Sequence, residues 1–311
     1  MLYDFLISKN IRENIIALYG ATGRQWLENF PQFLSRYEKQ WNFKAIKSFD
    51  DAQFNIVLDA ETVVFKCCVP NRVFNTEVKA LQHYNGNGAV KLLEYDIKNG
   101  AMLIEKINPG TLLEKVVSVE DATKKAINTC RKLHKPIDDQ TPFPTLQDWF
   151  EGFDQSIYAK FNGTPGPFSK ELINQAKSMS DSLLQSQSGL VLLHGDLHYA
   201  NLLSAENGEC IAIDPKGVIG EAEFEIPLPR ITNPMSKHET SLSHVTNPVS
   251  KKELLRHLDC YVELSGFDRK RIYNWLFVKS VLAAWWSVED SGTTNDLTHQ
   301  FLNVAETVQK Y

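Results

Sequence analysis

The stretch that decides the fold is residues 191–203, which reads VLLHGDLHYANLL. Apolar residues fill both ends of this stretch, and each apolar run has the length of a short buried strand rather than of a helix. Between the runs lies a polar insert, His194–Asn201, whose Gly195 marks a bend, as is typical of a loop held by core on both sides. The insert contains a carboxylate, two imidazoles and a carboxamide, and Asp214 follows at the end of another short apolar run. We therefore expect the chemistry of this protein at this loop.

Asp196, Asn201 and Asp214 offer the functional groups that phosphoryl transfer requires. A carboxylate can accept the proton of a hydroxyl group, and an amide oxygen with a second carboxylate suits Mg²⁺. Because the transition state is loose and highly charged, positioning and charge neutralisation supply most of the catalysis. The spacing of Asp196 and Asn201 also matches the catalytic loop of kinases. These residues predict a general base, Asp196, and two metal ligands, Asn201 and Asp214.

The part of the chain before residue 109 has the pattern of an antiparallel sheet with one internal helix. A helical lead-in over 9–37 is interrupted at Gly20 and Gly23. Strand-like runs separated by turn residues follow at 42–49, 54–58, 62–69, 89–95 and 101–105, with a helix at 72–84 between the third and fourth runs. These patterns predict a five-stranded sheet with one helix, ending at Asn108-Pro109-Gly110.

Lys66 lies in the third of these strands, directly after an apolar run. A lysine in a largely buried setting requires an anionic partner, and Glu77 in the next helix is a candidate. We expect this pair to hold Lys66 against the α and β phosphates of ATP. Taken alone, Lys66 also fits an edge-strand lysine kept for solubility, and Glu77 fits a solvated helix residue.

Beyond residue 108 the pattern is mainly helical. Helices are expected at 118–133, 146–161, 168–187, 251–264, 268–288 and 294–308. Ser118 and Ser250 are candidate N-caps, because serine is a preferred N-cap residue and an acidic first turn follows each of them. The proline-containing stretch 221–248 reads as a long surface segment. We predict two domains: residues 1–108, a nucleotide-binding lobe with its helical lead-in, and residues 109–311, a catalytic and substrate-binding lobe.

Composition limits the function classes. The 311 residues are 43% hydrophobic, which is ordinary for a globular protein, and the five cysteines form no CxxC pair. A net charge of −5 and a sequence pI of about 5.9 argue against nucleic acid as the main partner. No apolar run has the length of a membrane span, and the start of the chain does not resemble a signal peptide. We expect a cytoplasmic protein that is a monomer or a weak dimer.

The loop and several other stretches resemble a known family. His194–Asn201 is similar to the catalytic loop of aminoglycoside phosphotransferases, and Ile213–Gly220 resembles the streptomycin 6-kinase and hydroxyurea-resistance branch of that family. The resemblance also includes Asn85–Leu93, Leu103–Gly110 and Ala284–Asp290, and it extends in order from about residue 40 to the end of the chain.

The resemblance implies an α+β, two-lobed protein-kinase-like fold that uses ATP and Mg²⁺ to phosphorylate a small-molecule hydroxyl. Carried over by position, Asp196 is the base, Asn201 and Asp214 are metal ligands, and Lys66 contacts the phosphates. Adenine is expected to meet the backbone near Glu105 to Ile107. The expected acceptor is a small, hydroxylated, cationic molecule such as a streptomycin-like aminoglycoside, with hydroxyurea or another metabolite as alternatives.

Two stretches depart from the family pattern. The turn from Ser48 to Phe54 has Asp50 and Asp51 where the family usually has glycines over the phosphates, and these carboxylates would repel a triphosphate. A nucleotide-binding protein with little or no catalysis is therefore the main alternative. The second departure is Glu221–Arg230, where the branch more often reads Gly-Asp-Pro-Ala-Tyr followed by an apolar helix.

Other residues have more than one reading. A metal-dependent hydrolase would use His194, Asp196 and His198 as an HxDxH site, but this reading leaves Asn201 without a role. We expect His194 to be structural and His198 to be a candidate substrate contact. Glu289 and Asp290 oppose the macrodipole at a helix end, which makes them candidate ligands for cationic groups of the substrate. Trp285, Trp286 and Phe277 are read first as core and second as a substrate platform.

Overall fold

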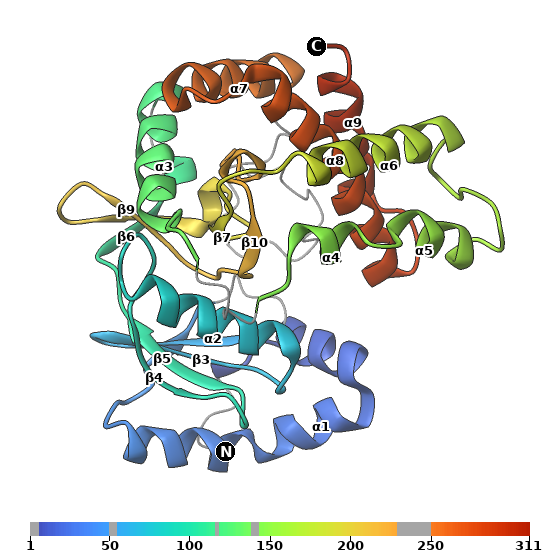
Figure 1. Cartoon of the computed structure of the whole chain (residues 1–311). Helices are drawn as coiled ribbons and strands as arrows, with labels where there is room; N and C mark the ends of the chain where they lie inside the picture. Colours follow the sequence, from blue (N-terminus) through green and yellow to red (C-terminus); the bar gives the residue numbers. More distant parts are fainter. Residues whose placement is uncertain (1–5, 50–54, 116–117, 138–142, 229–249) are drawn as a thin grey trace. The chain divides into compact units, whose positions relative to one another are not determined.

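The computed structural model describes residues 6–49, 55–115, 118–137, 143–228 and 250–311. The chain forms two compact units (Figure 1). Residues 1–111 together with 204–216 make up one, here called the sheet unit, and residues 112–203 together with 217–311 make up the other, the helical unit. The division predicted at residue 108 stays a prediction.

The sheet unit is built on a five-stranded antiparallel sheet in the order β1-β2-β3-β5-β4. The strands are β1 (Lys47–Ser48), β2 (Ile56–Ala60), β3 (Val63–Cys67), β4 (Leu92–Asp96) and β5 (Ala101–Glu105). The predicted five strands are confirmed, although the first is only two residues long. The predicted turn at Asp50–Gln53 lies outside the described residues.

Two helices cover the opposite faces of this sheet (Figure 1). Helix α1 (Lys9–Gln40) has its predicted break at Gly20, which adopts φ 57° and ψ −126°. Helix α2 (Arg72–Tyr84) has the predicted bounds, because Asn71 caps it by accepting from the Phe74 amide and Asn85 ends it in the left-handed conformation. The side chains of β3 alternate between the two helices. Phe65 packs among the aromatic rings Phe33, Tyr37, Trp41 and Phe43 on the α1 side, and Lys66 contacts Glu77 of α2.

The helical unit contains α3 (Val119–Leu133), α4 (Leu146–Phe150), α5 (Phe153–Lys160), α6 (Lys170–Gln185), α7 (Lys251–Ser265), α8 (Arg269–Ser291) and α9 (Asp296–Val308). Ser118 and Ser250 are N-caps, as predicted. The single helix predicted over 146–161 is wrong in its middle, because Gly152 adopts φ 65° and separates α4 from α5. Helix α8 is buried at the centre of the unit, where Trp275, Phe277 and Trp285 belong to the main hydrophobic core.

Short strands flank the polar loop. Strand β7 (Val191–Leu193) pairs antiparallel with β10 (Val218–Gly220), with Leu193 opposite Val218. After the loop, the 3₁₀ turn η3 (Tyr199–Asn201) leads into β8 (Leu202–Ala205). Strand β8 lies between β6 (Pro109–Leu112) and β9 (Cys210–Ala212) in a small sheet. The loop is thus held by strands on both sides, as its flanking apolar runs predict.

The prediction of a surface segment over 221–248 is wrong for its first eight residues. Glu221, Phe224 and Glu225 are almost completely buried in and beside the 3₁₀ turn η4 (Ala222–Phe224). The carboxylates of Glu221 and Glu225 can be buried because they accept hydrogen bonds from protein donors, as described below. Phe224 packs on Phe150 and Trp275. Residues 229–248 lie outside the described part of the chain.

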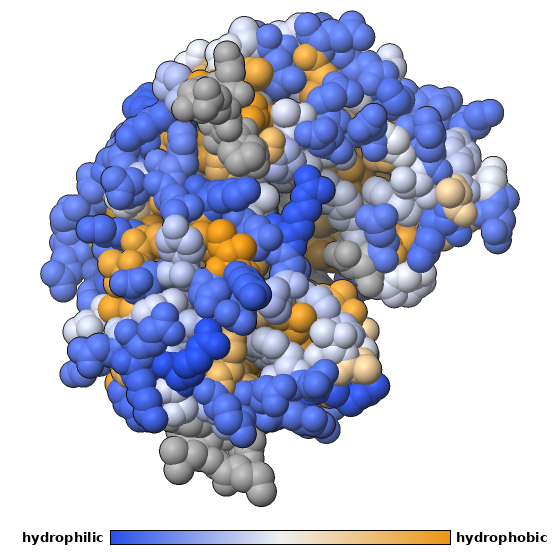
Figure 2. Space-filling view, turned by 60° about the horizontal axis from the view of Figure 1, so that its bottom comes forward, coloured by the Kyte–Doolittle hydropathy of each residue, from blue (hydrophilic) through white to orange (hydrophobic). Residues whose placement is uncertain are grey.

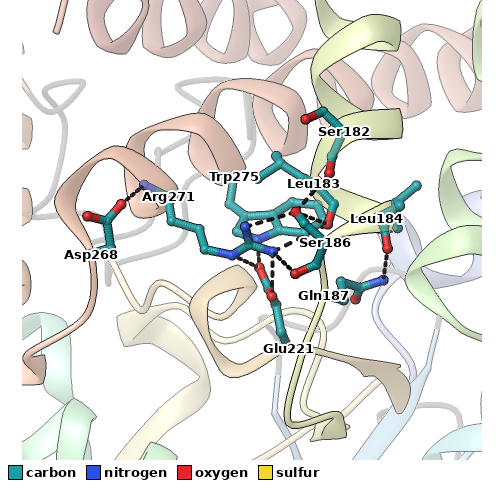
Figure 3. A network of polar contacts seen from close by, with 9 residues as sticks. All are labelled: Ser182, Leu183, Leu184, Ser186, Gln187, Glu221, Asp268, Arg271 and Trp275. Atoms are coloured by element: carbon teal, nitrogen blue, oxygen red, sulfur yellow. Dashed lines mark hydrogen bonds and ion pairs between the residues drawn. The ribbon is translucent and has the colours of Figure 1, made fainter.

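A buried ion pair holds η4 against the helices (Figure 3). Arg271 of α8 donates from Nε and Nη2 to the two carboxylate oxygens of Glu221 at 2.6 Å each, and the Trp275 indole donates to the same carboxylate. The guanidinium also donates to the backbone oxygens of Leu183 and Ser186 at the end of α6. This bidentate pair therefore ties α6, α8 and η4 together.

The surface is largely hydrophilic in the view of Figure 2, where hydrophobic residues form small scattered patches. Within the described ranges, no helix is both long enough and apolar enough to cross a membrane. All five cysteines are free thiols, four of them buried and Cys260 partly exposed.

Candidate functional site

The sheet unit brings three of the predicted residues into direct contact. The Lys66 ammonium lies 2.6 Å from Glu77 Oε1 and 3.0 Å from Asp214 Oδ1. Lys66 and Glu77 are buried, with exposed fractions of 2% and 6%, whereas the Asp214 side chain is 43% exposed. Lys66 is therefore not an edge-strand lysine. It is a buried cation held between the buried carboxylate of Glu77 and the partly exposed carboxylate of Asp214.

Local structure explains how Asp214 reaches Lys66 from far along the chain. Strand β9 is attached to the segment after α2 by two backbone hydrogen bonds, Val90 N to Ala212 O at 2.9 Å and Ala212 N to Gly88 O at 2.8 Å. Asp214 itself adopts φ 61°, a left-handed conformation that aspartate tolerates better than most residues. The chain turns sharply there, and the carboxylate comes to lie beside the lysine.

The charges of these groups are strongly coupled. Burial alone lowers the pKa of Lys66, but the nearby negative charges of Asp214 and Glu77 raise it above its ordinary value. Burial raises the pKa of Glu77, and the Lys66 ammonium opposes that shift at a distance of 2.6 Å. The lysine therefore stays an ammonium at neutral pH, as a contact for phosphate oxygens requires.

The polar loop brings a second group of predicted residues together in the helical unit. Asn201 donates from Nδ2 to the Asp196 carbonyl at 2.9 Å, and its amide hydrogen bonds the His198 carbonyl at 2.8 Å. His198 Nε2 lies 3.9 Å from Asp196 Oδ1, and the Asp196 side chain is 47% exposed. The loop thus folds on its own backbone and presents the Asp196 carboxylate to solvent.

His194 is structural, in agreement with the expectation from sequence. It is completely buried, and its Nδ1 accepts from the Asp196 amide at 3.2 Å. A ring nitrogen used in this way does not fit the HxDxH site considered above. Among the described residues, no group of three or more histidine, cysteine, aspartate or glutamate side chains is arranged to hold a metal ion.

The residue that fixes the loop, Glu225, was missed at the sequence level. Its carboxylate accepts from the backbone amides of His194 at 2.6 Å and of Gly195 at 2.9 Å. Its Oε2 also lies 3.3 Å from His134 Nε2. Burial alone raises the pKa of Glu225, but the hydrogen bond and charge of His134, with smaller contributions from His194 and Lys279, lower it to about 2. A signal was available: Glu221 and Glu225 alternate with apolar residues in a stretch that departs from the family pattern.

The predicted adenine-contacting residues lie at the end of β5. The Glu105 amide donates to the Lys91 carbonyl at 3.0 Å, and the Glu105 carboxylate accepts from the Lys91 amide at 2.7 Å. The side chain and the backbone amide of Glu105 therefore both secure the start of β4. Ile107 follows after Lys106, whose ammonium bonds Asp59 at 2.7 Å.

The remaining predicted substrate residues are less connected. Glu289 is exposed on α8, and no hydrogen bond or ion pair within the described ranges links it to the loop. Asp290 belongs to the same helix, but its side chain lies outside the described part of the structure. The fold thus assembles two groups of the predicted residues, and within the described ranges Glu289 has no hydrogen bond or ion pair to either group.

The predicted Mg²⁺ ligands are chemically suitable. Asn201 uses its amide nitrogen within the loop, so its amide oxygen faces away from that hydrogen bond, and Asp214 offers a half-exposed carboxylate. Mg²⁺ at a nucleotide is commonly held by one or two such oxygen ligands together with phosphates, rather than by a cage of protein groups. Each of these two donors, taken by itself, therefore suits a metal that enters with a nucleotide.

Comparison with known proteins gives the family. The model of the aminoglycoside/hydroxyurea antibiotic resistance kinase family matches residues 59–291. The chain belongs to this family. It is therefore a small-molecule phosphotransferase, as the loop chemistry predicts.

Individual relatives are distant but cover most of the chain. A streptomycin 6-kinase of Streptomyces glaucescens is 24% identical over 89% of this chain and 89% of its own length. A hydroxyurea phosphotransferase of Kitasatospora aureofaciens is 25% identical over 87% of this chain and 77% of its own length.

Solved structures show the fold. A choline kinase from Streptococcus pneumoniae is 12% identical with a TM-score of 0.62, covering 90% of this chain and 99% of that one. An aminoglycoside phosphotransferase solved with ADP and hygromycin B is 12% identical with a TM-score of 0.61, covering 91% of this chain and 98% of that one. The predicted kinase-like fold, with an antiparallel sheet and a mainly helical part, is confirmed.

Proposed function

We propose that this protein transfers the γ-phosphoryl group of ATP to a hydroxyl of a small molecule, with Asp196 as the general base. The observation that carries the proposal is the Asp196 carboxylate, half exposed on a loop whose backbone amides are fixed by the buried Glu225. Preorganisation of this kind places a base without requiring the loop to reorganise during the reaction.

The residues of the sheet unit suit the nucleotide. The Lys66 ammonium, oriented by Glu77 and Asp214, contacts the α and β phosphates, and the backbone near Glu105 to Ile107 meets adenine. Asn201 and Asp214 hold Mg²⁺, which neutralises phosphate charge when it is bound. Asp196 accepts the proton of the attacking hydroxyl, and the acceptor then forms an O–P bond as the bond to ADP breaks.

The relatives support the choice of acceptor. Streptomycin 6-kinases from two Streptomyces species are similar to this chain along nearly its whole length, which supports a streptomycin-like aminoglycoside. A hydroxyurea phosphotransferase is about equally similar, so hydroxyurea is the second candidate within the same reaction class. His198, Glu289 and Asp290 are the candidate acceptor contacts.

The test is the Asp196→Asn substitution, which keeps the shape of the side chain and removes the base. We expect kcat to fall by about 100-fold or more, since general bases contribute factors of that order. ATP binding, measured by thermal shift with and without Mg²⁺, should be retained. Asp181→Asn on the surface of α6 is the control and should leave turnover unchanged.

Full phosphotransfer by Asp196→Asn would contradict the mechanism. The main alternative, a nucleotide-binding protein without catalysis, predicts a thermal shift with ATP but no phosphorylated product from streptomycin, hydroxyurea or other amino and sugar alcohols. This alternative arose from Asp50 and Asp51, which lie outside the described residues.

A further inference from the structure

The middle of helix α8 is buried except along one narrow stripe. From Trp275 to Val288 every residue is buried apart from Lys279, Ala283 and Trp286. These three residues are spaced by four and three positions, so they share one face of the helix. We call them the open stripe. A helix at the centre of a core has no structural need for an exposed stripe that contains a lysine and a tryptophan.

The inner end of the open stripe is Lys279, whose ammonium contacts an aromatic ring. The Lys279 ammonium lies 4.8 Å from the centroid of the Phe224 ring. Burial lowers the pKa of Lys279, and the negative charges of Glu225 and Asp196 oppose that shift. Within the described residues, this ammonium makes no hydrogen bond and no ion pair. The nearby carboxylate of Glu225 accepts from the loop amides instead. The ammonium lies over Phe224, the neighbour of the Glu225 that holds the loop, and its three N–H donors are suited to an oxygen acceptor there.

The outer end of the open stripe is an aromatic surface. Trp286, 36% exposed, packs edge to face on Trp149 with ring centroids 5.3 Å apart. Trp149 in turn lies 6.2 Å from Phe224, the ring beneath the Lys279 ammonium. A chain of ring contacts thus links Lys279 through Phe224 and Trp149 to Trp286, and Ala283, the small residue between the two ends of the stripe, is partly exposed.

We propose that the open stripe is the binding subsite for the phosphate acceptor, with Lys279 donating a hydrogen bond to an acceptor oxygen and Trp286 packing against a ring face. This inference rests on the proposed function, because Asp196 marks the end at which the reacting hydroxyl lies. It also orients the acceptor. An ammonium near Lys279 would be repelled, so hydroxyl or carbonyl oxygens face Lys279, and any cationic group lies toward Trp286, where a ring face attracts it.

The test compares acceptor kinetics of three variants with wild type, using streptomycin, hydroxyurea and myo-inositol with ATP and Mg²⁺. Lys279→Met and Trp286→Ala should each raise the KM for the acceptor by about tenfold or more, since each removes a contact of more than about 1.4 kcal/mol. The KM for ATP should not change. Lys270→Met, which alters an exposed lysine at the start of the same helix, should match wild type in both constants.

The two proposals fail in different ways. If wild type phosphorylates a compound and both variants keep its acceptor KM, the subsite is overturned while the phosphotransferase function stands. If wild type phosphorylates none of the compounds, the proposed function is overturned. Binding to the subsite is then measured by tryptophan fluorescence. If none of the compounds changes the fluorescence of wild type, the subsite proposal is overturned as well. Trp286→Ala changes an exposed side chain, so it decides the question even if Lys279→Met does not fold.

Discussion

Replacing Glu225 by glutamine should destabilise the catalytic loop and remove part of the acid sensitivity of the protein. In wild type the carboxylate accepts two backbone amides, at 2.6 and 2.9 Å, and each such bond to a charged group is worth about 1.5–3 kcal/mol. Glutamine retains one acceptor oxygen, and its NH₂ group would meet the second amide hydrogen. We therefore expect the free energy of unfolding at pH 7 to fall by about 2–4 kcal/mol.

The pH dependence gives an independent measure of the same interaction. The pKa of Glu225 is lowered from 4.5 to about 2 in the folded protein, so its contribution to stability is complete above pH 4.5 and is lost as the pH falls toward 2. The full contribution is about 3 kcal/mol, of which about 1 kcal/mol is lost between pH 7 and pH 4. The Glu225→Gln variant lacks this titrating group, so its stability should fall by about 1 kcal/mol less than that of wild type over the same range.

Urea unfolding followed by tryptophan fluorescence measures both effects, because Trp149, Trp275, Trp285 and Trp286 lie in the helical unit with the loop. Glu223→Gln is the matched control: it makes the same change two residues earlier, at a side chain with no hydrogen bond to another described residue. An equal urea midpoint for Glu225→Gln and wild type would refute the reasoning. So would parallel pH dependences of the two proteins.

Two further predictions concern the framework. Arg271→Gln should lower the free energy of unfolding by about 3–5 kcal/mol, because it leaves the buried Glu221 carboxylate without its cation. Lys270→Gln, at the adjacent exposed position, is the control and should have little effect in the same urea titration. Gly100→Ala should destabilise by about 1–3 kcal/mol more than Gly208→Ala. Both glycines have positive φ, but of the two only at Gly100 would the new Cβ collide with a backbone oxygen, that of Cys68. Equal thermal shifts for the two alanine variants would show that the close contact at Gly100 is relieved.

Local signals explain what could be predicted. The end of helix α2 was predicted because Gly86 and Gly88 follow it in sequence, and Lys66 was found because a lysine after an apolar strand needs a partner. The break at Gly152 was missed, since a single glycine within a helical pattern does not reveal its φ of 65°.

The alternation of Glu221 and Glu225 with apolar residues could have indicated burial, but the role of Glu225 depends on donors that are distant in the chain. A glutamate next to prolines is ordinarily a surface residue. Only the fold shows that the amides of His194 and Gly195, 31 and 30 residues earlier, point at its carboxylate. The same holds for Asp214, which lies 148 residues from Lys66 along the chain.

The alternation of β3 has a consequence for how the charged site is specified. Phe65 and Lys66 are neighbours on opposite faces of one strand, so a shift of the strand by one residue would exchange their environments. The ammonium would then enter the aromatic cluster around Phe33 and Tyr37, and the phenyl ring would face Glu77. Burial of an unpaired charge among aromatic rings is so unfavourable that the α1 face selects the register of the strand. The aromatic packing of α1 thus fixes the position of a lysine on the opposite face of the strand.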